Sequence, residues 1–469
     1  MNTRSIVLNM LIRINEDGLL SHLVIRETFA KLADYLPRDR AFMKRLTEGT
    51  LENQIQIDYI IDLFAKTSVK QMKPLIRNLL RLSVYQIIFM NQVPDRAACD
   101  EAVKLAAQRG FSSLKGFVNG ILRNIIRQKD ALNLPKEADE PIKYLSVAFS
   151  MPEWLIEKWR KDYQYEKLKA ILQGLLEIRP VTLRLNRKVE RKALSTIDFE
   201  SADGGDGDKN ENFILEIEEW RQAIKASGAD IRPHPYLNYA YEISEMDSIS
   251  DLPGFKEGFF AIQDLSSMLV CEAADIKPTD IIVDICAAPG GKALHAATKG
   301  RLVLARDVSE AKCDLIRENA YRLNQTNIEI STYDASILDD SLIEKADVLL
   351  ADLPCSGFGV IGRKPDIKYK ASPESIDALC DLQRGILSVA WQYVKPGGVL
   401  IYSTCTMNRD ENENMMEWFV ENFPFSYDPL PDILRSLEAP GEKNETGILR
   451  LLPGIHKTDG FFICRLKRK

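Results

Sequence analysis

The sequence predicts a multidomain protein in which an all-helical N-terminal part precedes a C-terminal α/β part with a doubly wound sheet. The chain has 469 residues, more than one hydrophobic core usually organises. Apolar residues recur with helical spacing to about residue 130, and strand-like runs alternate with helix-like runs from Phe255 onward. We therefore expect domains at residues 1–135, 136–255 and 256–469.

The N-terminal part is expected to form a compact helical bundle. The stretches "RSIVLNMLIRI", "MKPLIRNLLRLSVYQIIFM" and "LKGFVNGILRNIIRQK" place apolar residues at positions i, i+3, i+4 and i+7. Pro37, Pro74, Pro94 and Gly110 separate such stretches. Because no cluster of catalytic residue types appears in this region, we expect it to bind a partner.

Charge is distributed unevenly along the chain, whose net charge is −6. Residues 1–135 contain 20 Lys and Arg against 13 Asp and Glu, whereas residues 136–469 contain 42 against 55. A basic N-terminal third attached to an acidic remainder indicates a polyanion-facing surface in residues 1–135. A solvated basic face explains the same charge equally well, so both interpretations stay open.

The middle region is expected to be a linker followed by a small α+β subdomain that binds RNA. "LPKEADEP" at 134–141 is charged and bounded by prolines, "PEWLIEKWRKDY" is typical of an amphipathic helix, and "PVTLRLN" of a strand. Residues 200–219 carry eight acidic residues and one lysine. We interpret this segment as a solvated acidic insertion outside the core.

The C-terminal part alternates strands and helices. The expected strands are "DIIVDICA", "RLVLARD", "IEISTYD", "ADVLLADLP", "GGVLIYSTC" and the closing "GFFICRLKR". Such alternation predicts a doubly wound sheet that binds its ligands at the carboxyl ends of the strands.

The turn "DICAAPGGK" at 284–292 leads from the first of these strands into a helix. Gly290 and Gly291 allow a ligand to approach the backbone closely. The turn matches neither GxxxxGK[ST] nor GxGxxG. It suits a carboxylate-bearing adenosyl ligand better than a triphosphate, and a plain strand-to-helix turn is the alternative.

Three aspartates follow successive strands of this part. Asp307, Asp334 and Asp352 end "RLVLARD", "IEISTYD" and "ADVLLAD". An acidic residue after the second strand can accept hydrogen bonds from ribose hydroxyls. One such aspartate could be a helix cap, but three at one sheet edge favour a binding site.

Eight cysteines are present, and the pattern of their spacing matters more than their number. None forms CxxC or has a histidine at zinc-like spacing, so we expect no metal site and no disulfide framework. Cys355 and Cys405 both follow strands at the predicted ligand edge. Either alone would be read as a small buried hydrophobe, whereas the pair favours thiolate chemistry, although no histidine is an evident base.

No uncharged apolar run of about 18 residues occurs, which argues against a transmembrane helix. The N-terminus is better explained by an amphipathic helix than by a signal peptide. We expect a cytoplasmic protein without membrane association.

These motifs together resemble the RNA cytosine-5 methyltransferases of the Nop2/Sun/Fmu family. The most specific are "DICAAPGGK", "DLPCSGFGVIGRKPDIKY", "VKPGGVLIYSTCT" and "TDGFFICRL", and the resemblance covers nearly the whole chain. "PRDRAFMKRLTEGTL", "LLRLSVYQIIF" and "LKGFVNGILRNI" resemble the NusB-type RNA-binding helical domain. The resemblance implies a NusB-like bundle followed by a Rossmann-like, class I methyltransferase domain.

By this resemblance the cofactor is S-adenosylmethionine, and no metal is needed. Cys405 in "STC" matches the family nucleophile, and Cys355 in "PC" matches the cysteine that assists product release. Asp307 would hold the ribose, Asp334 would lie near the adenine, and Asp352 would lie between the cofactor and the N3/N4 edge of the target base. The cofactor turn would comprise Cys286, Ala287, Ala288, Pro289, Gly290, Gly291 and Lys292. Ala293 stands where the family turn usually has a threonine.

The implied reaction is methylation of C5 of a specific cytosine in 16S ribosomal RNA through a covalent Cys–C6 intermediate. The substrate would be RNA, free or in an assembling small subunit, and the enzyme would be a monomer. Methylation of tRNA or another rRNA site stays an alternative. A non-catalytic RNA-binding assembly factor would be expected to have lost a cysteine or the cofactor turn, and neither is lost. A DNA methyltransferase would need a target-recognition domain that the sequence lacks.

Overall fold

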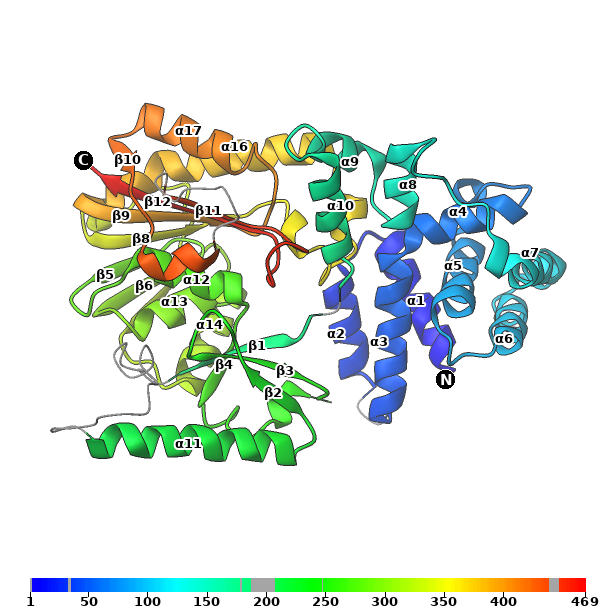
Figure 1. The fold of residues 1–469 in the computed structure, drawn as a ribbon, viewed down its shortest axis with the longest axis horizontal. Helices are drawn as coiled ribbons and strands as arrows, with labels where there is room; N and C mark the ends of the chain where they lie inside the picture. Colours follow the sequence, from blue (N-terminus) through cyan, green and yellow to red (C-terminus); the bar gives the residue numbers. More distant parts are fainter. Residues whose placement is uncertain (1, 33–34, 178, 187–206, 247, 438–446) are drawn as a thin grey trace. The chain divides into compact units, whose positions relative to one another are not determined.

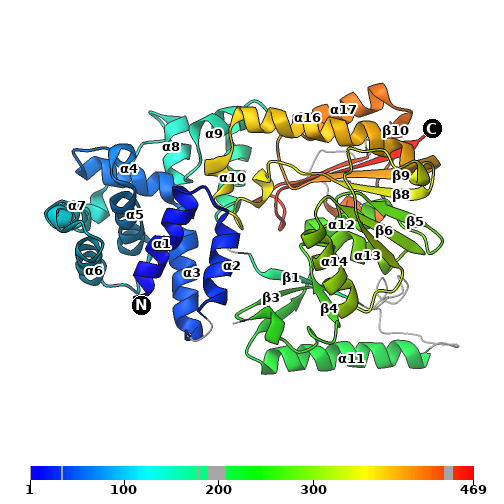
Figure 2. The ribbon, with the colours of Figure 1, turned by 180° about the vertical axis from the view of Figure 1, so that it is seen from behind.

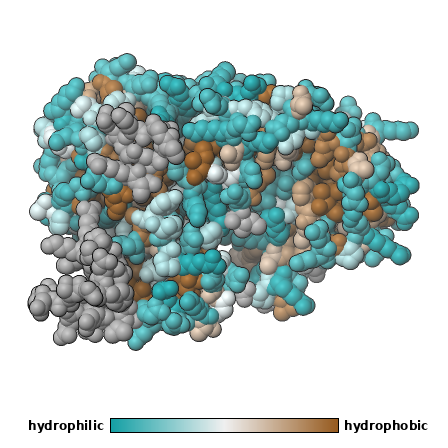
Figure 3. Space-filling model, viewed as in Figure 1, coloured by the Kyte–Doolittle hydropathy of each residue, from teal (hydrophilic) through white to brown (hydrophobic). Residues whose placement is uncertain are grey.

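The computed structural model describes residues 2–32, 35–177, 179–186, 207–246, 248–437 and 447–469. The chain divides into two compact units, one of residues 1–177 with 360–372 and one of residues 178–359 with 373–469 (Figure 1). Within the described part, every helix is too short or too polar to cross a membrane. On the face shown in Figure 3, hydrophilic side chains cover most of the surface and hydrophobic ones show between them.

The helical unit is built around one buried helix, α5. The unit contains α1 (Thr3–Asn15), α2 (Ser21–Ala30), α3 (Pro37–Glu52), α4 (Gln54–Phe64), α5 (Pro74–Phe89), α6 (Asp95–Gln108), α7 (Lys115–Gln128), α8 (Pro141–Ala148), α9 (Glu153–Trp159), α10 (Tyr165–Gly174) and the short α15 (Ile367–Lys370). Helix α5 starts with Pro74, which is tolerated in the first turn because its missing N–H would have no partner there. It contacts α1, α3, α4, α6 and α7, and a Cβ at Gly49 of α3 would lie 2.1 Å from the Tyr85 ring atom Cζ. The predicted helical N-terminal part is confirmed.

Residues 360–372 come from the C-terminal half of the sequence but belong to the helical unit. We call them the inserted segment. Helix α2 has no side-chain cap of its own, and Asp366 of the inserted segment accepts hydrogen bonds from the Ser21 hydroxyl and, at 3.1 Å, from the Ser21 backbone N–H. Tyr369 Oη donates to the Leu51 carbonyl at 2.7 Å. The inserted segment therefore satisfies backbone groups at the start of α2 and the end of α3.

Lys368 of the inserted segment is 1% exposed, and its Nζ donates to the Glu52 carbonyl at 2.8 Å. Burial disfavours the ammonium form and lowers the pKa of Lys368 to about 7, an effect that the Glu52 carboxylate only partly opposes. In the unfolded chain the lysine has its ordinary pKa near 10.5. Between these two values the unfolded chain holds more protons, so this group makes the free energy of unfolding rise with pH.

Lys368→Met should remove that pH dependence. Relative to the variant, the wild-type free energy of unfolding should rise by about 2 kcal/mol between pH 7 and pH 9. Urea unfolding of both proteins across this range measures the difference. Lys370→Met, on the same segment and partly exposed, is the matched control and should follow the wild type. Parallel pH profiles for wild type and Lys368→Met would contradict the prediction.

The second unit contains a doubly wound sheet, as the sequence predicted. Its strands are β5 (Ile281–Asp284), β6 (Leu302–Asp307), β7 (Ile328–Thr332), β8 (Ala346–Asp352), β9 (Val394–Thr404), β10 (Phe425–Tyr427), β11 (Ile448–Leu451) and β12 (Phe461–Arg468). The order is β10-β12-β9-β8-β5-β6-β7, with β11 paired to β12. Strands β5 to β9 are parallel, and β12 runs antiparallel to β9.

Helices cover both faces of this sheet. Figures 1 and 2 show α16 (Pro373–Ala390) and α17 (Glu413–Asn422) on one face and α12 (Leu265–Ala274), α13 (Gly291–Ala297) and α14 (Glu310–Arg322) on the other. Chain order reverses between β5 and β8, where a doubly wound sheet opens a crevice at its carboxyl edge.

A smaller antiparallel sheet lies in the same unit. Its strands are β1 (Val181–Leu185), β2 (Asp230–Pro233), β3 (Ala240–Ser244) and β4 (Phe260–Ile262), in the order β2-β3-β1-β4. Of these, only β1 had a clear sequence signal. The acidic segment 200–219 runs into α11 (Gly207–Ala226), whose Trp220 and Ile224 are buried against this sheet, while residues 200–206 lie outside the described residues.

Candidate active site

The turn after β5 has the backbone geometry of a ligand cradle. Gly290 adopts φ +104°, a conformation that favours glycine, and its N–H donates to the Ala287 carbonyl at 2.7 Å. A Cβ at Gly290 would lie 3.1 Å from Leu294 and 3.2 Å from Ile316. The Ala288 N–H donates to Asp307 Oδ2 at 3.2 Å. The aspartate that ends β6 therefore holds the turn that follows β5.

Asp284, the last residue of β5, is buried at this turn and was not among the residues expected from the sequence. Its Oδ1 accepts the Cys286 N–H at 3.4 Å, and its Oδ2 has no hydrogen-bond partner among the described residues. Burial, helped by the charge of Asp352 and opposed by Lys292, raises the pKa of Asp284 to about 7. The open oxygen is an acceptor suited to a cationic or N–H donor.

Asp352 lies at the carboxyl end of β8, opposite Ser403 of β9 in the parallel register. Its Oδ1 accepts the Ser403 hydroxyl at 2.8 Å, and its Oδ2 accepts Lys292 Nζ at 2.7 Å. Burial alone would lower the pKa of Lys292, but Asp352, with smaller contributions from Asp284 and Cys405, raises it. Lys292 is therefore held as an ammonium ion beside the two strand ends.

The two cysteines expected at this edge are in contact. Cys355 Sγ and Cys405 Sγ lie 3.4 Å apart. The hydrogen bond to Cys405 is the main cause that raises the pKa of Cys355 well above its usual value, and burial and the negative charge of Cys405 act in the same direction. Cys355 therefore holds its proton strongly, while the geometry allows either sulfur to be the donor of the hydrogen bond between them.

A buried carboxylate, Glu411, holds the loops that carry both cysteines. Its Oε1 accepts the Ser356 N–H at 2.8 Å, and its Oε2 accepts the Ser356 hydroxyl at 2.6 Å and Asn408 Nδ2 at 2.9 Å. Ser356 Oγ also lies 2.7 Å from Thr406 Oγ1. Because Ser356 follows Cys355 and Thr406 follows Cys405, this network fixes the two sulfur atoms relative to each other.

Close backbone packing supports the same arrangement. The Gly359 N–H donates to the Cys405 carbonyl at 2.9 Å, and the Gly460 N–H donates to the Gly359 carbonyl at 2.9 Å. A Cβ at Gly359 would lie 1.8 Å from the Gly460 carbonyl oxygen. Only glycine fits here, which gives a physical reason for the glycines in "CSGFG" and "TDGFF".

The expected site residues fall into two groups. The structure brings together the turn residues, Asp307, Asp352, Cys355 and Cys405 at the carboxyl edge of the sheet. Asp334 does not join these contacts, because it is exposed and lies two residues beyond the end of β7. It accepts the Ser336 hydroxyl at 2.7 Å and the Ser336 N–H at 2.9 Å, and these hydrogen bonds lower its pKa. Asp284, Ser403 and Glu411 were missed. Glu411 lies in "NRDENEN", which reads as the polar start of a helix and gives no sign of burial.

The strand order, with antiparallel β12 beside β9, and the turn after β5 define a Rossmann-like methyltransferase fold joined to a helical domain. The family model described as 16S rRNA methyltransferase RsmB/F matches residues 272–467, and that of the NusB family matches residues 1–127.

Relatives match over the full length of the chain. A probable ribosomal RNA small subunit methyltransferase B from Bacillus subtilis is 35% identical over 100% of this chain and 99% of its own length. The Cronobacter sakazakii ribosomal RNA small subunit methyltransferase B is 28% identical over 100% and 99% of the two chains. The chain belongs to the ribosomal RNA small subunit methyltransferase B family.

Solved structures share the fold. The structure titled PH0851 has a TM-score of 0.76 at 23% identity and covers 100% of this chain and 99% of that chain. NSun6 from Pyrococcus horikoshii with SFG has a TM-score of 0.54 at 23% identity and covers 68% of this chain and 98% of that chain.

Glu411→Gln should loosen the thiol pair without removing either thiol. In the variant, an amide NH2 group replaces one carboxylate oxygen and faces hydrogen-bond donors that have lost their acceptor. We therefore expect the free energy of unfolding to fall by about 1–3 kcal/mol. The contact between Cys355 and Cys405 should also loosen, and alkylation of Cys405 by iodoacetamide at neutral pH should slow. Urea unfolding and peptide mass spectrometry measure the two effects.

Glu417→Gln on α17 is the control, because Glu417 has a side chain 59% exposed and lies outside the network. An alkylation rate unchanged by Glu411→Gln would show that Glu411 does not set the thiol geometry.

Proposed function

We propose that the protein transfers a methyl group from S-adenosylmethionine to C5 of a cytosine in 16S ribosomal RNA, with Cys405 as covalent nucleophile and Cys355 as the group that assists release. The observation that carries this proposal is the contact between the two sulfur atoms, 3.4 Å apart, together with the raised pKa of Cys355. The family to which the chain belongs supports rRNA as the substrate.

The chemistry explains the need for a nucleophile. C5 of cytosine is a weak nucleophile, because its electrons are delocalised in the aromatic ring. The Cys405 thiolate adds to C6, forming the S–C6 bond and moving the C5–C6 π electrons to C5. C5 would then form a bond to the methyl carbon that S-adenosylmethionine supplies, while the sulfonium–methyl bond breaks and its electron pair stays on the sulfur of the departing S-adenosylhomocysteine. Loss of the C5 proton restores the C5–C6 double bond as the S–C6 bond breaks and Cys405 leaves as a thiolate.

The two roles of Cys355 follow from what raises its pKa. In the resting site its S–H donates to Cys405 and stabilises the attacking thiolate. Once Cys405 is bonded to C6, it no longer carries a charge and is a poor acceptor. The hydrogen bond that raises the pKa of Cys355 is then absent, so its thiol can lose its proton to water and become a thiolate. That thiolate can accept the C5 proton, directly or through water, and so allow Cys405 to leave.

Asp352 and Lys292 are proposed to hold the base edge. Each oxygen of Asp352 keeps a lone pair after accepting from Ser403 or Lys292, so the carboxylate can contact the N3/N4 edge of cytosine. The adjacent ammonium stabilises negative charge that develops as the thiolate adds. To reach this site the base must be unstacked or already single-stranded.

The residues around the turn after β5 fit an adenosyl cofactor, which supplies the methyl group when bound. Gly290 adopts the positive φ that the tight turn requires, and the unpartnered Asp284 Oδ2 is a suitable acceptor for the cofactor's ammonium group. Asp307, which already holds the turn, would accept the ribose hydroxyls. The turn residues Cys286 to Lys292 would line the methionine part, and Asp334 would lie near the adenine.

Substituting the two cysteines should give opposite results. Cys405→Ala should abolish 5-methylcytosine formation, because no S–C6 bond can form. Cys355→Ala should allow addition and methyl transfer but slow release, so protein should accumulate on RNA as an adduct that survives denaturing gels. Bisulfite sequencing of rRNA and tRNA from cells expressing each variant locates the product, and gels of purified protein with RNA measure the adduct.

Cys380→Ala is the matched control, since Cys380 is a buried thiol on α16 and should be dispensable. Methylation by Cys405→Ala would rule out the assigned nucleophile. A Cys355→Ala protein that turns over like wild type would rule out the release role. Methylation confined to tRNA would exclude 16S rRNA as the substrate.

A further inference from the structure

Three cationic side chains and a histidine lie where α2 meets the inserted segment of the helical unit. His22 and Arg26 come from α2, and Lys364 and Lys370 come from the inserted segment. We call them the α2 basic surface. The two residues of α2 are at least 338 positions away in the sequence from the two residues of the inserted segment. No local run of charge in the sequence therefore indicates this surface.

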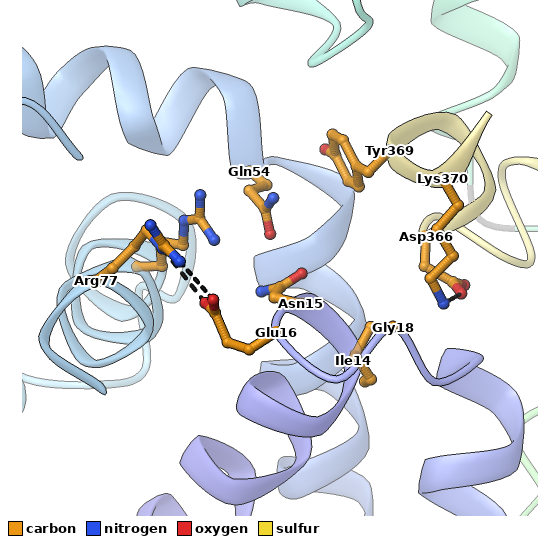
Figure 4. A pocket seen from close by; sticks show the side chains of 10 residues that line it. Ile14, Asn15, Glu16, Gly18, Gln54, Arg77, Asp366, Tyr369 and Lys370 are labelled. Atoms are coloured by element: carbon orange, nitrogen blue, oxygen red, sulfur yellow. Dashed lines mark hydrogen bonds and ion pairs between the residues drawn. The ribbon is translucent and has the colours of Figure 1, made fainter. Parts of the chain in front are cut away.

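Docking of the inserted segment brings these residues together. Asp366 bonds the first residue of α2, Ser21, and Lys370 Nζ donates to the Leu19 carbonyl at 2.6 Å and to Asp366 Oδ2 at 2.7 Å. Figure 4 shows Asp366 and Lys370 on the inserted segment, facing the loop that carries Gly18. Lys364 is two residues before Asp366, which places it at the N-terminal end of α2 beside His22.

Lys370 is paired with Asp366, whereas the charges of Arg26 and Lys364 are uncompensated within the described residues. Burial lowers the pKa of His22, and Lys364, Arg26 and Lys370 lower it further, while Asp366 alone opposes them. The Asp366 side chain is only 3% exposed and already bonds Ser21 and Lys370. Arg26 and Lys364 are exposed, and within the described ranges neither has a carboxylate partner. The surface therefore presents positive charge to solvent.

The neighbouring pocket is a poorer candidate for the same role. It has a volume of about 240 Å³ and is lined by α1, α4, α5 and the inserted segment (Figure 4). Its arginines are paired within the unit, Arg77 with Glu16 at 3.3 Å and Arg81 with Asp58 at 2.6 Å. A ligand there would meet cations that are already neutralised, whereas a polyanion on the α2 basic surface would not.

Apolar side chains lie among these cations. Leu19, Leu20 and Leu23 are 41%, 42% and 41% exposed. Single-stranded RNA offers both matching features, phosphates for the cations and unstacked base faces for the leucines. A double helix would hide its base faces and leave the leucines in contact with water.

We propose that the α2 basic surface binds the phosphate backbone of a single-stranded part of the substrate RNA; this rests on the proposed function and names where the RNA is held. Lys364 follows Cys355 by nine residues in the sequence. One continuous stretch of backbone thus carries the release thiol and then a phosphate-binding lysine.

The test is the salt dependence of RNA binding by full-length protein. The probe is a single-stranded 16S rRNA fragment, and the variant is Arg26→Gln with Lys364→Gln. Loss of two phosphate contacts should reduce the slope of log affinity against log salt by roughly 1.4 and weaken binding roughly tenfold near 0.15 M salt. Arg96→Gln with Lys115→Gln, on α6 and α7, removes the same charge from exposed positions and should keep the wild-type slope.

Equal salt slopes for the two double variants would overturn the proposal. It would also be overturned if Arg26→Gln with Lys364→Gln weakened binding to a ribosomal protein and left RNA binding unchanged. Melting curves of both variants check that each is folded. Methylation of the same RNA by wild type is measured in parallel. If wild type does not methylate but the slopes differ, the proposed reaction fails while the RNA surface stands; if it methylates and the slopes agree, only the surface fails.

Discussion

The contact between the Cys355 and Cys405 sulfur atoms is the constraint on which the rest of the catalytic edge depends. Two thiols 3.4 Å apart cannot both ionise easily in a buried site, so one proton is shared and the pair is divided into a donor and an acceptor. That division needs the loops after β8 and β9 to keep a fixed separation. Glu411 provides it through Ser356, and the Gly359–Gly460 approach closes the loops from the other side.

The same loop that carries Cys355 continues into the inserted segment of the helical unit. There it satisfies backbone groups that the helices leave open, with Asp366 at the start of α2 and Tyr369 at the end of α3. Lys368 is buried at the same place in spite of the cost of burying its charge. These specific polar contacts make the inserted segment part of the folded helical unit. Domain boundaries drawn from the sequence alone would assign the segment to the C-terminal domain instead.

Much of this could be predicted from sequence because it rests on local pattern or on the geometry of parallel sheets. Strand and helix alternation predicts a doubly wound sheet, and the carboxyl ends of parallel strands meet at one edge, which places Asp352, Cys355 and Cys405 together. The remainder depends on long-range partners. Asp366 caps a helix 345 residues earlier, and Glu411 is buried only because four polar groups from three segments surround it. Neither of these long-range contacts produces a periodicity or a motif in the sequence. For Asp334 the local pattern itself was misleading. The predicted strand extended to Asp334, whereas β7 ends two residues earlier, at Thr332.

The most direct test of the account uses 16S rRNA in which the target cytosine carries fluorine at C5. Addition and methyl transfer can proceed on this base, but C5 then has no proton to lose, so the S–C6 bond cannot be broken by elimination. Incubation with protein and S-adenosylmethionine, nuclease and protease digestion, and mass spectrometry identify the cysteine that holds the nucleotide. The account predicts a methylated fluorocytosine on the peptide that contains Cys405. A nucleotide on Cys355, or no covalent product from an otherwise active protein, would contradict it.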